Sequence, residues 1–366
     1  MKKEMMSSKQ IIHIMIIYIL GSALVMGGNT TAKQDSWISI LLAMLVMIPI
    51  CFMYGKLSKL YPGKNIFDMF YESFGKIAGS VFTAIFTIYA LHLGGIVTRN
   101  FTEFIETVSL PETPQFAVAI VIGVLSLWTV KAGIEILGRG AVLVTPIVGI
   151  AVILTLLANI NHIDLSYIQP VFAQGLGKMF SGSIYYISFP FAEIVLFLSV
   201  MPCVDSKTNP YKIYLISLAI GGFLLLLAML RNILVLGIPT LQSLYFPSYA
   251  AVGIINIKEF ITRIEVLVAG NFIISGLAKA CICLYVTCKG MARLFNVRNY
   301  KVFAAPAAFL MIAVSGWLFS STMEMMAFFE PYKYYAPVLQ ILVPFVILLI
   351  ALVKKRKNKK TTAEKA

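Results

Sequence analysis

The sequence predicts an all-α integral membrane protein with ten transmembrane helices. Three observations carry this prediction: 59% of the 366 residues are hydrophobic, only 13% are charged, and the mean hydropathy is +0.88. A soluble domain has about 25% charged residues, because it must cover its surface with polar groups. We therefore expect one membrane domain over residues 1–366, with a basic cytoplasmic tail at 354–366.

Ten apolar segments are long enough to cross a bilayer, which takes about 20 residues in a helix. The sixth and eighth, Leu176–Val204 and Ile264–Cys288, each contain two charged residues. We expect Pro247–Phe260, which is shorter and more polar, to form an interfacial loop or helix. The other eight spans contain no Asp, Glu, Lys or Arg: Ile11–Gly28, Trp37–Tyr54, Ile77–Thr98, Thr113–Val130, Gly140–Ile160, Ile213–Leu230, Val302–Met323 and Tyr334–Val353.

The basic residues gather on one side of these spans. Of the 30 Lys and Arg residues, 22 fall in the N-terminal segment, the loops after even-numbered spans and the C-terminal tail. By the positive-inside rule, both termini are expected to be cytoplasmic. The run Lys354–Lys357 could also bind anionic membrane lipid, although a basic stop signal beside the last helix explains it without that role.

Ten helices divide into two groups of five. Because five crossings leave the chain on the opposite side of the membrane, the second group must be inverted relative to the first. We expect inverted repeats at about residues 8–160 and 174–353, as in transporters of the LeuT/APC type, whose sites lie at interrupted helices one and six. In helix one, Gly21, Ser22 and Ala23 lie about 20 Å along the helix and permit a kink. Ordinary packing through small residues is the alternative.

Helix six contains Ser188, Phe189 and Pro190 at a matching depth, about 22 Å from its start. Proline has no N–H and clashes with the preceding turn, so it opens the hydrogen-bond ladder. The freed N–H groups of a broken helix can hold a carboxylate, and the freed carbonyls an ammonium group or a cation. The two breaks therefore predict a mid-membrane site for a zwitterion such as a free amino acid.

Lys279 and Glu193 are charges deep inside predicted spans. Lys279 lies ten residues before Lys289, hence about 15 Å from the cytoplasmic end of helix eight. An ionisable group at that depth marks a functional-site candidate. We expect Lys279 beside helix one, contacting the ligand and serving as an ion or proton carrier, with Glu193 in the same coupling role. A structural ion pair between the two residues is the alternative.

Helix three is expected to provide a side wall for the site. Tyr89 and Leu93 lie four residues apart and so share a helix face, with His92 at a neighbouring position. We expect Tyr89 and Leu93 to close the pocket, although simple packing also explains an aromatic residue on an apolar helix. Arg99 and Glu103, again four apart, predict an ion pair on the surface near the outer end of this helix.

The sequence shows no enzyme signature, since it lacks a phosphate-binding loop and an HExxH motif. The five cysteines lie in or beside apolar segments without metal-ligand spacing, which predicts buried thiols. The net charge of +14 comes from basic clusters between apolar runs, a topology signal rather than a nucleic-acid surface. We expect no cofactor, no metal and no nucleic-acid partner.

Short motifs spread over nearly the whole chain resemble those of a known family, the B subunits of bacterial spore germinant receptors, a branch of the amino acid–polyamine–organocation superfamily. Ser22 and Ala23 depart from the Gly-Thr-Gly form often found in helix one of that family. The motifs are Gly21–Leu24, Gln34–Ser39, Tyr61–Lys64, Phe74–Lys76, Leu110–Pro114, Pro170–Phe172 with Gly175–Gly177, and Ile187–Phe189 with Glu193.

The resemblance implies a multi-pass protein of the spore inner membrane that senses a small nutrient, commonly an amino acid, and triggers germination. It implies two partner subunits, a large membrane-anchored subunit and a lipoprotein. A proton-coupled amino acid or polyamine permease is an alternative, because it would use the same pocket. A water- or ion-conducting pore is a third reading, compatible with the small residues of helices one and three.

Overall fold

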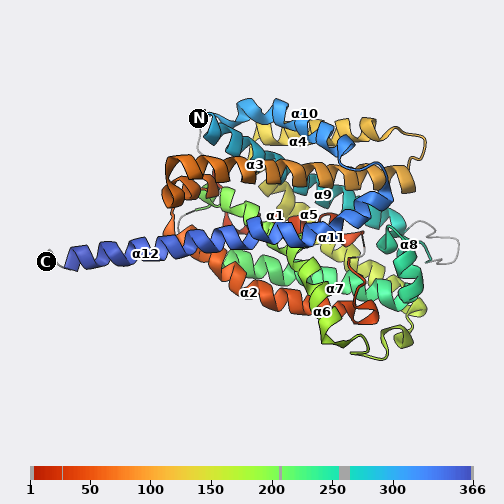
Figure 1. The fold of residues 1–366 in the computed structure, drawn as a ribbon. Helices are drawn as coiled ribbons and strands as arrows, with labels where there is room; N and C mark the ends of the chain where they lie inside the picture. The colour runs from red at the N-terminus through yellow and green to blue at the C-terminus, as the bar shows by residue number, and fades with distance from the viewer. Residues whose placement is uncertain (1–3, 27, 206–207, 255–263, 364–366) are drawn as a thin grey trace.

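The computed structural model describes residues 4–26, 28–205, 208–254 and 264–363 of the chain. These residues form a bundle of helices that lie side by side, from which the end of the last helix projects (Figure 1). The α-helices are α1 (Ser8–Leu20), α2 (Ser36–Leu60), α3 (Ile66–Val108), α4 (Gln115–Ala132), α5 (Ile134–Ala158), α6 (Gly175–Tyr186), α7 (Pro210–Ser243), α8 (Pro247–Gly253), α9 (Glu265–Leu294), α10 (Ala304–Trp317), α11 (Thr322–Pro337) and α12 (Val343–Ala363).

The predicted all-α membrane architecture is confirmed. Within the described residues, nine helical segments are long and apolar enough to cross a membrane. The first predicted span contains α1, which has only 13 residues because it ends at a break after Leu20. The count of ten spans and the inverted repeat stay predictions.

The second half of helix six is buried inside the bundle. It consists of α6, the π-helical turn η5 (Ile187–Phe191) and the 3₁₀ helix η6 (Ala192–Ser199). The apolar window within Gly175–Ser199 is 89% buried, against 33% for the window in α4. The protein therefore shields η5 and η6 from lipid, and polar groups on them can be paired inside the bundle, whereas Leu176 and Phe180 of α6 are exposed.

Helix seven is longer than the predicted span Ile213–Leu230. The apolar run stops at Arg231, yet α7 continues past it and changes direction at Gly237, whose φ is 65°. Arg231 is only 2% exposed. Its Nη1 donates to Thr155 Oγ1 at 2.8 Å and its Nε to Asn232 Oδ1 at 3.2 Å. These partners explain how the helix carries a guanidinium group inside the bundle.

The predicted interfacial segment Pro247–Phe260 begins as the short helix α8, while its part from residue 255 onward lies outside the described residues. Ser248 of α8 donates its hydroxyl proton to the Leu24 carbonyl at 2.7 Å, and Asn232 Nδ2 donates to Ser248 Oγ at 2.8 Å. One end of α8 is therefore attached to the chain just after the break in helix one.

Candidate functional site

The break in helix one depends on Gly21. Its φ of 23° and ψ of −129° end α1, and the 3₁₀ turn η1 (Ser22–Leu24) follows. A Cβ on Gly21 would lie 2.7 Å from Lys279 Cδ and 2.9 Å from the Tyr18 carbonyl oxygen. Only glycine therefore permits both the positive φ and the close approach of the lysine side chain to the backbone. Ser22 and Ala23 are both buried.

Lys279 of α9 lies directly beside this break. Its side chain is fully buried, and its Nζ is 2.5 Å from Glu193 Oε2. The ammonium group also faces the rings of Phe189 and Tyr18, at 4.5 and 5.2 Å from their centroids. Charge pairing and the ring faces compensate for the missing water. The structure shows Lys279 beside helix one, as expected, and its pairing with Glu193 is the ion pair that the sequence offered as the alternative to a ligand-binding role.

The break in helix six lies at Phe189, whose φ of −144° and ψ of 111° are not helical. Ser188, Phe189 and Pro190 are all buried. Glu193 follows in the first turn of η6, at the start of the second half of the helix. A carboxylate is favourable there, because the partial positive charge of a helix lies at its N-terminus.

A chain of buried hydrogen bonds continues from Glu193 to α11, α3 and the turn η9 (Val338–Leu342) before α12. Tyr332 donates its hydroxyl proton to Glu193 Oε1 at 2.7 Å, and its oxygen is 3.3 Å from the Tyr89 hydroxyl. Gln340 Nε2 donates to Tyr89 Oη at 2.8 Å and to the Ser188 carbonyl at 2.9 Å. The carbonyl at the break in helix six thus already has a donor, supplied by Gln340 of helix ten (the predicted span Tyr334–Val353).

The remaining predicted residues of helix three differ in their placement. Leu93 is fully buried in the core that also contains Tyr89. His92 packs instead against the rings of Phe328 and Tyr335, with centroid distances of 5.7 and 6.4 Å. His92 therefore belongs to an aromatic cluster with α11 and not to the hydrogen-bonded chain.

The ion pair of Arg99 and Glu103 is present at 2.6 Å, but the prediction that it lies on the surface is wrong. The two side chains are 9% and 4% exposed. Gln115 at the start of α4 donates to Glu103 at 3.1 Å, and Thr322 at the start of α11 donates to its other oxygen. Because α3 runs on to Val108, these two neighbouring helices cover the pair.

Two cavities lie on either side of the two breaks. One, of about 240 Å³, is lined by Tyr185 at the end of α6 and by Phe329 of α11. Their rings lie 6.1 and 4.8 Å from that of Phe189, so three aromatic side chains separate this cavity from Lys279. The other cavity is lined by Met201, which follows η6 along the same predicted span. The break at Phe189 therefore lies between the two cavities along helix six.

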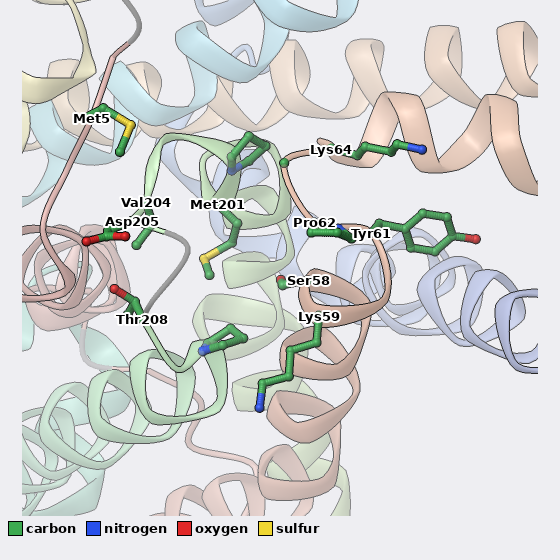
Figure 2. A pocket seen from close by; sticks show the side chains of 13 residues that line it. Met5, Ser58, Lys59, Tyr61, Pro62, Lys64, Met201, Val204, Asp205 and Thr208 are labelled. Atoms are coloured by element: carbon green, nitrogen blue, oxygen red, sulfur yellow. The ribbon is translucent and has the colours of Figure 1, made fainter. Parts of the chain in front are cut away.

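The second cavity has a volume of about 300 Å³. In Figure 2, Met201 lies in the middle of the labelled residues, between Asp205 and Thr208 on one side and Ser58 and Lys59 on the other. The N-terminal segment passes beside it, and the Met6 N–H donates to the Cys203 carbonyl at 2.7 Å. Lys279, Glu193 and the backbone at both breaks are buried between these two cavities.

The chain matches the model of a family described as spore germination protein, over residues 5–322. The chain belongs to this family. It is 27% identical to spore germination protein KB of Bacillus subtilis (strain 168) over 375 aligned residues, with all of both chains covered. A second spore germination protein of that strain, YfkT, is 27% identical over 322 residues, covering 87% of this chain and 88% of its own length.

Two solved structures share the fold of this spore germination protein. Mhp1, a nucleobase-cation-symport-1 family transporter in a closed conformation with bromovinylhydantoin bound, has a TM-score of 0.65 at 12% identity, covering 90% of this chain and 75% of Mhp1. MhsT in complex with L-phenylalanine has a TM-score of 0.63 at 12% identity, covering 96% and 99%. The family places this multi-pass membrane protein among spore germination proteins, not among enzymes, and the two neighbours show that its fold is one that transporters also have.

Sequence reasoning missed two members of the buried chain in this spore germination protein, Tyr332 and Gln340. Gln340 is the one amide side chain in the apolar run Tyr334–Val353. A polar group inside a span usually faces the bundle interior, so the sequence could have predicted that Gln340 belongs to the site. Tyr332 precedes that run among other aromatic residues, and its spacing does not distinguish it from them.

Proposed function

We propose that this spore germination protein is the nutrient-sensing subunit of a germinant receptor in the spore inner membrane. Its ligand would be a small zwitterion, most simply an amino acid, held at mid-membrane between α1, α3, the broken helix six and α9. The observation that carries the proposal is the fully buried pair of Lys279 and Glu193, which lies between the two backbone breaks.

The backbone at the two breaks supports this ligand class. The turn after Gly21 offers N–H groups toward a carboxylate. The Ser188 carbonyl accepts from Gln340 Nε2, and a ligand ammonium group could replace that donor. The fold neighbour MhsT was solved with L-phenylalanine, an amino acid, which agrees with a zwitterionic ligand for this fold.

Ligand binding would shift the population between the present arrangement, in which both breaks are buried, and an open one. A ligand can do this only through different affinities for the two arrangements. Exchanging Gln340 for a ligand amine supplies such a difference, because Gln340 belongs to helix ten and Ser188 to helix six. The movement would be passed on to two partner subunits, a large membrane-anchored subunit and a lipoprotein.

A second candidate function is a proton-coupled amino acid or polyamine permease. The observation that favours it is the pairing of an acid and an amine inside the membrane, at 2.5 Å, where the gain or loss of one proton by the pair changes the charge of the site. In this function, Lys279 and Glu193 would carry the proton that drives uptake.

Germination of spores that lack the gene, tested with single nutrients, identifies the ligand. Spores carrying Lys279→Met are then expected to need at least about tenfold more of that nutrient, equal to about 1.4 kcal/mol of lost interaction. An unchanged nutrient response would remove Lys279 from the site. Concentrative uptake of the labelled nutrient by the purified chain in liposomes would favour the permease instead.

A further inference from the structure

A hollow of about 640 Å³ lies on the outside of the bundle between α2 and α12. Its walls are apolar side chains of α2, α12 and the turn η9 (Val338–Leu342) before α12, together with Tyr211 of α7. Phe52 of α2 and Phe345 of α12 are 48% and 46% exposed. In a membrane-spanning chain, such exposed rings face hydrocarbon, so the hollow opens toward lipid.

A second hollow, of about 560 Å³, follows along the same pair of helices. On α2 the first hollow is lined by residues between Pro49 and Lys56, and the second begins at Lys59. On α12 the first ends at Leu348, and the second begins at Ala351. Both hollows lie along α2 and α12, which are in contact, and together they are called the furrow here. The furrow is apolar in its first hollow and basic in its second, near the C-terminal tail.

The basic end of this furrow has more positive than negative charge. It contains Lys59, Lys354 and Lys355, with Lys56 just before them. The one carboxylate in its lining, Glu72, forms an ion pair with Lys64 at the edge of the furrow. Lys354 donates to the Glu72 backbone carbonyl, and Lys59 lies over the Tyr211 ring at 4.6 Å.

Within the described residues, none of the ammonium groups of Lys56, Lys59 and Lys355 is held in an ion pair. All three side chains are exposed. A cluster of uncompensated lysines at the membrane surface attracts anionic headgroups.

We propose that the furrow between α2 and α12 binds one anionic glycerophospholipid. An acyl chain would lie in the apolar part, and the phosphate would lie between Lys59 and Lys355. The size of the furrow favours lipid over a helix of a partner subunit. From Pro49 to Lys56, the apolar part extends about 10 Å along α2, whereas a transmembrane helix would follow a groove for about 30 Å.

The test compares lipid binding to the purified full chain in detergent, measured by native mass spectrometry. The probes are dioleoylphosphatidylglycerol and dioleoylphosphatidylcholine, which share acyl chains and differ in headgroup charge. We expect the wild type to retain one phosphatidylglycerol molecule at a concentration at which phosphatidylcholine is lost. The double variant Lys59→Gln/Lys355→Gln should bind phosphatidylglycerol with an affinity that is lower by a factor of about ten or more.

The matched control is Lys76→Gln/Arg298→Gln, which removes the same charge from two exposed residues outside the furrow. This control should bind phosphatidylglycerol like the wild type. Leu348→Trp, which fills the apolar part, should also weaken binding. The proposal is overturned if both lipids bind alike, if the control loses as much affinity as the furrow variant, or if Leu348→Trp changes nothing.

Discussion

Lys279 and Glu193 show how a charge is kept inside this membrane protein. Each is fully buried, and each depends on the other, because the Lys279 ammonium group is 2.5 Å from one carboxylate oxygen and Tyr332 donates to the other. The pair therefore adds little to the net free energy of folding, because the cost of desolvating both charges offsets much of their attraction. Its main effect is to keep a defined polar site inside the bundle.

This dependence predicts non-additive effects on stability. Lys279→Met leaves a carboxylate buried without its cation and should lower the free energy of unfolding by about 3–5 kcal/mol. Adding Glu193→Gln removes that orphaned charge, so the double variant should recover much of the loss. Thermal unfolding in detergent measures both, and a double variant that is merely the sum of the single ones would contradict the pairing.

Gln340 predicts a gain of ligand sensitivity. If its amide holds the place of a ligand ammonium group at the Ser188 carbonyl, Gln340→Leu removes that competitor. A hydrogen bond of about 0.5–1.5 kcal/mol then corresponds to a nutrient requirement lowered about two- to tenfold. Dose–response curves of germination measure this, with Gln174→Leu as the same change outside the site. A raised requirement in Gln340→Leu alone would instead make Gln340 a ligand contact.

At the scale of the element, the break in helix one can be tested through its glycine. Gly21→Ala places a Cβ against Lys279 and the Tyr18 carbonyl at a positive φ, and should destabilise the protein by about 1–3 kcal/mol. Gly177→Ala is the control, because it lies in α6 with nothing within 4 Å of the added Cβ. Equal melting temperatures for the two variants would show that helix one does not need the break.

Sequence reasoning located the two backbone breaks and the buried charges better than the residues that pack around them. The pattern of an apolar helix is interrupted at Gly21, Pro190 and Lys279, so these residues can be recognised from the sequence alone. The burial of Arg99 and Glu103 could not be found in this way, because it comes from the ends of α4 and α11, which are distant in sequence. Tyr332 was missed for the same reason, since only the packing of α11 brings it to Glu193.

At the scale of the whole molecule, the buried breaks lie between two cavities, which we expect to have different roles. One opens beyond the aromatic layer of Tyr185, Phe189 and Phe329, and the other lies beside the N-terminal segment at Met6. For a sensor, opening either end is enough to signal, whereas a permease must open both in turn. The side of the membrane from which each cavity can be reached therefore reports both the orientation of the chain and its function.

Single cysteines provide that measurement, because the five native cysteines are all buried. Ser58→Cys lies in the cavity near the N-terminus, and Thr30→Cys lies in the opposite one. With cytoplasmic termini, a membrane-impermeant thiol reagent should modify Thr30→Cys in intact cells and reach Ser58→Cys only after permeabilisation. The reverse pattern would place the termini outside. A ligand that exposes both positions alternately would indicate full transport cycling, whereas a sensor should change the reactivity of one side.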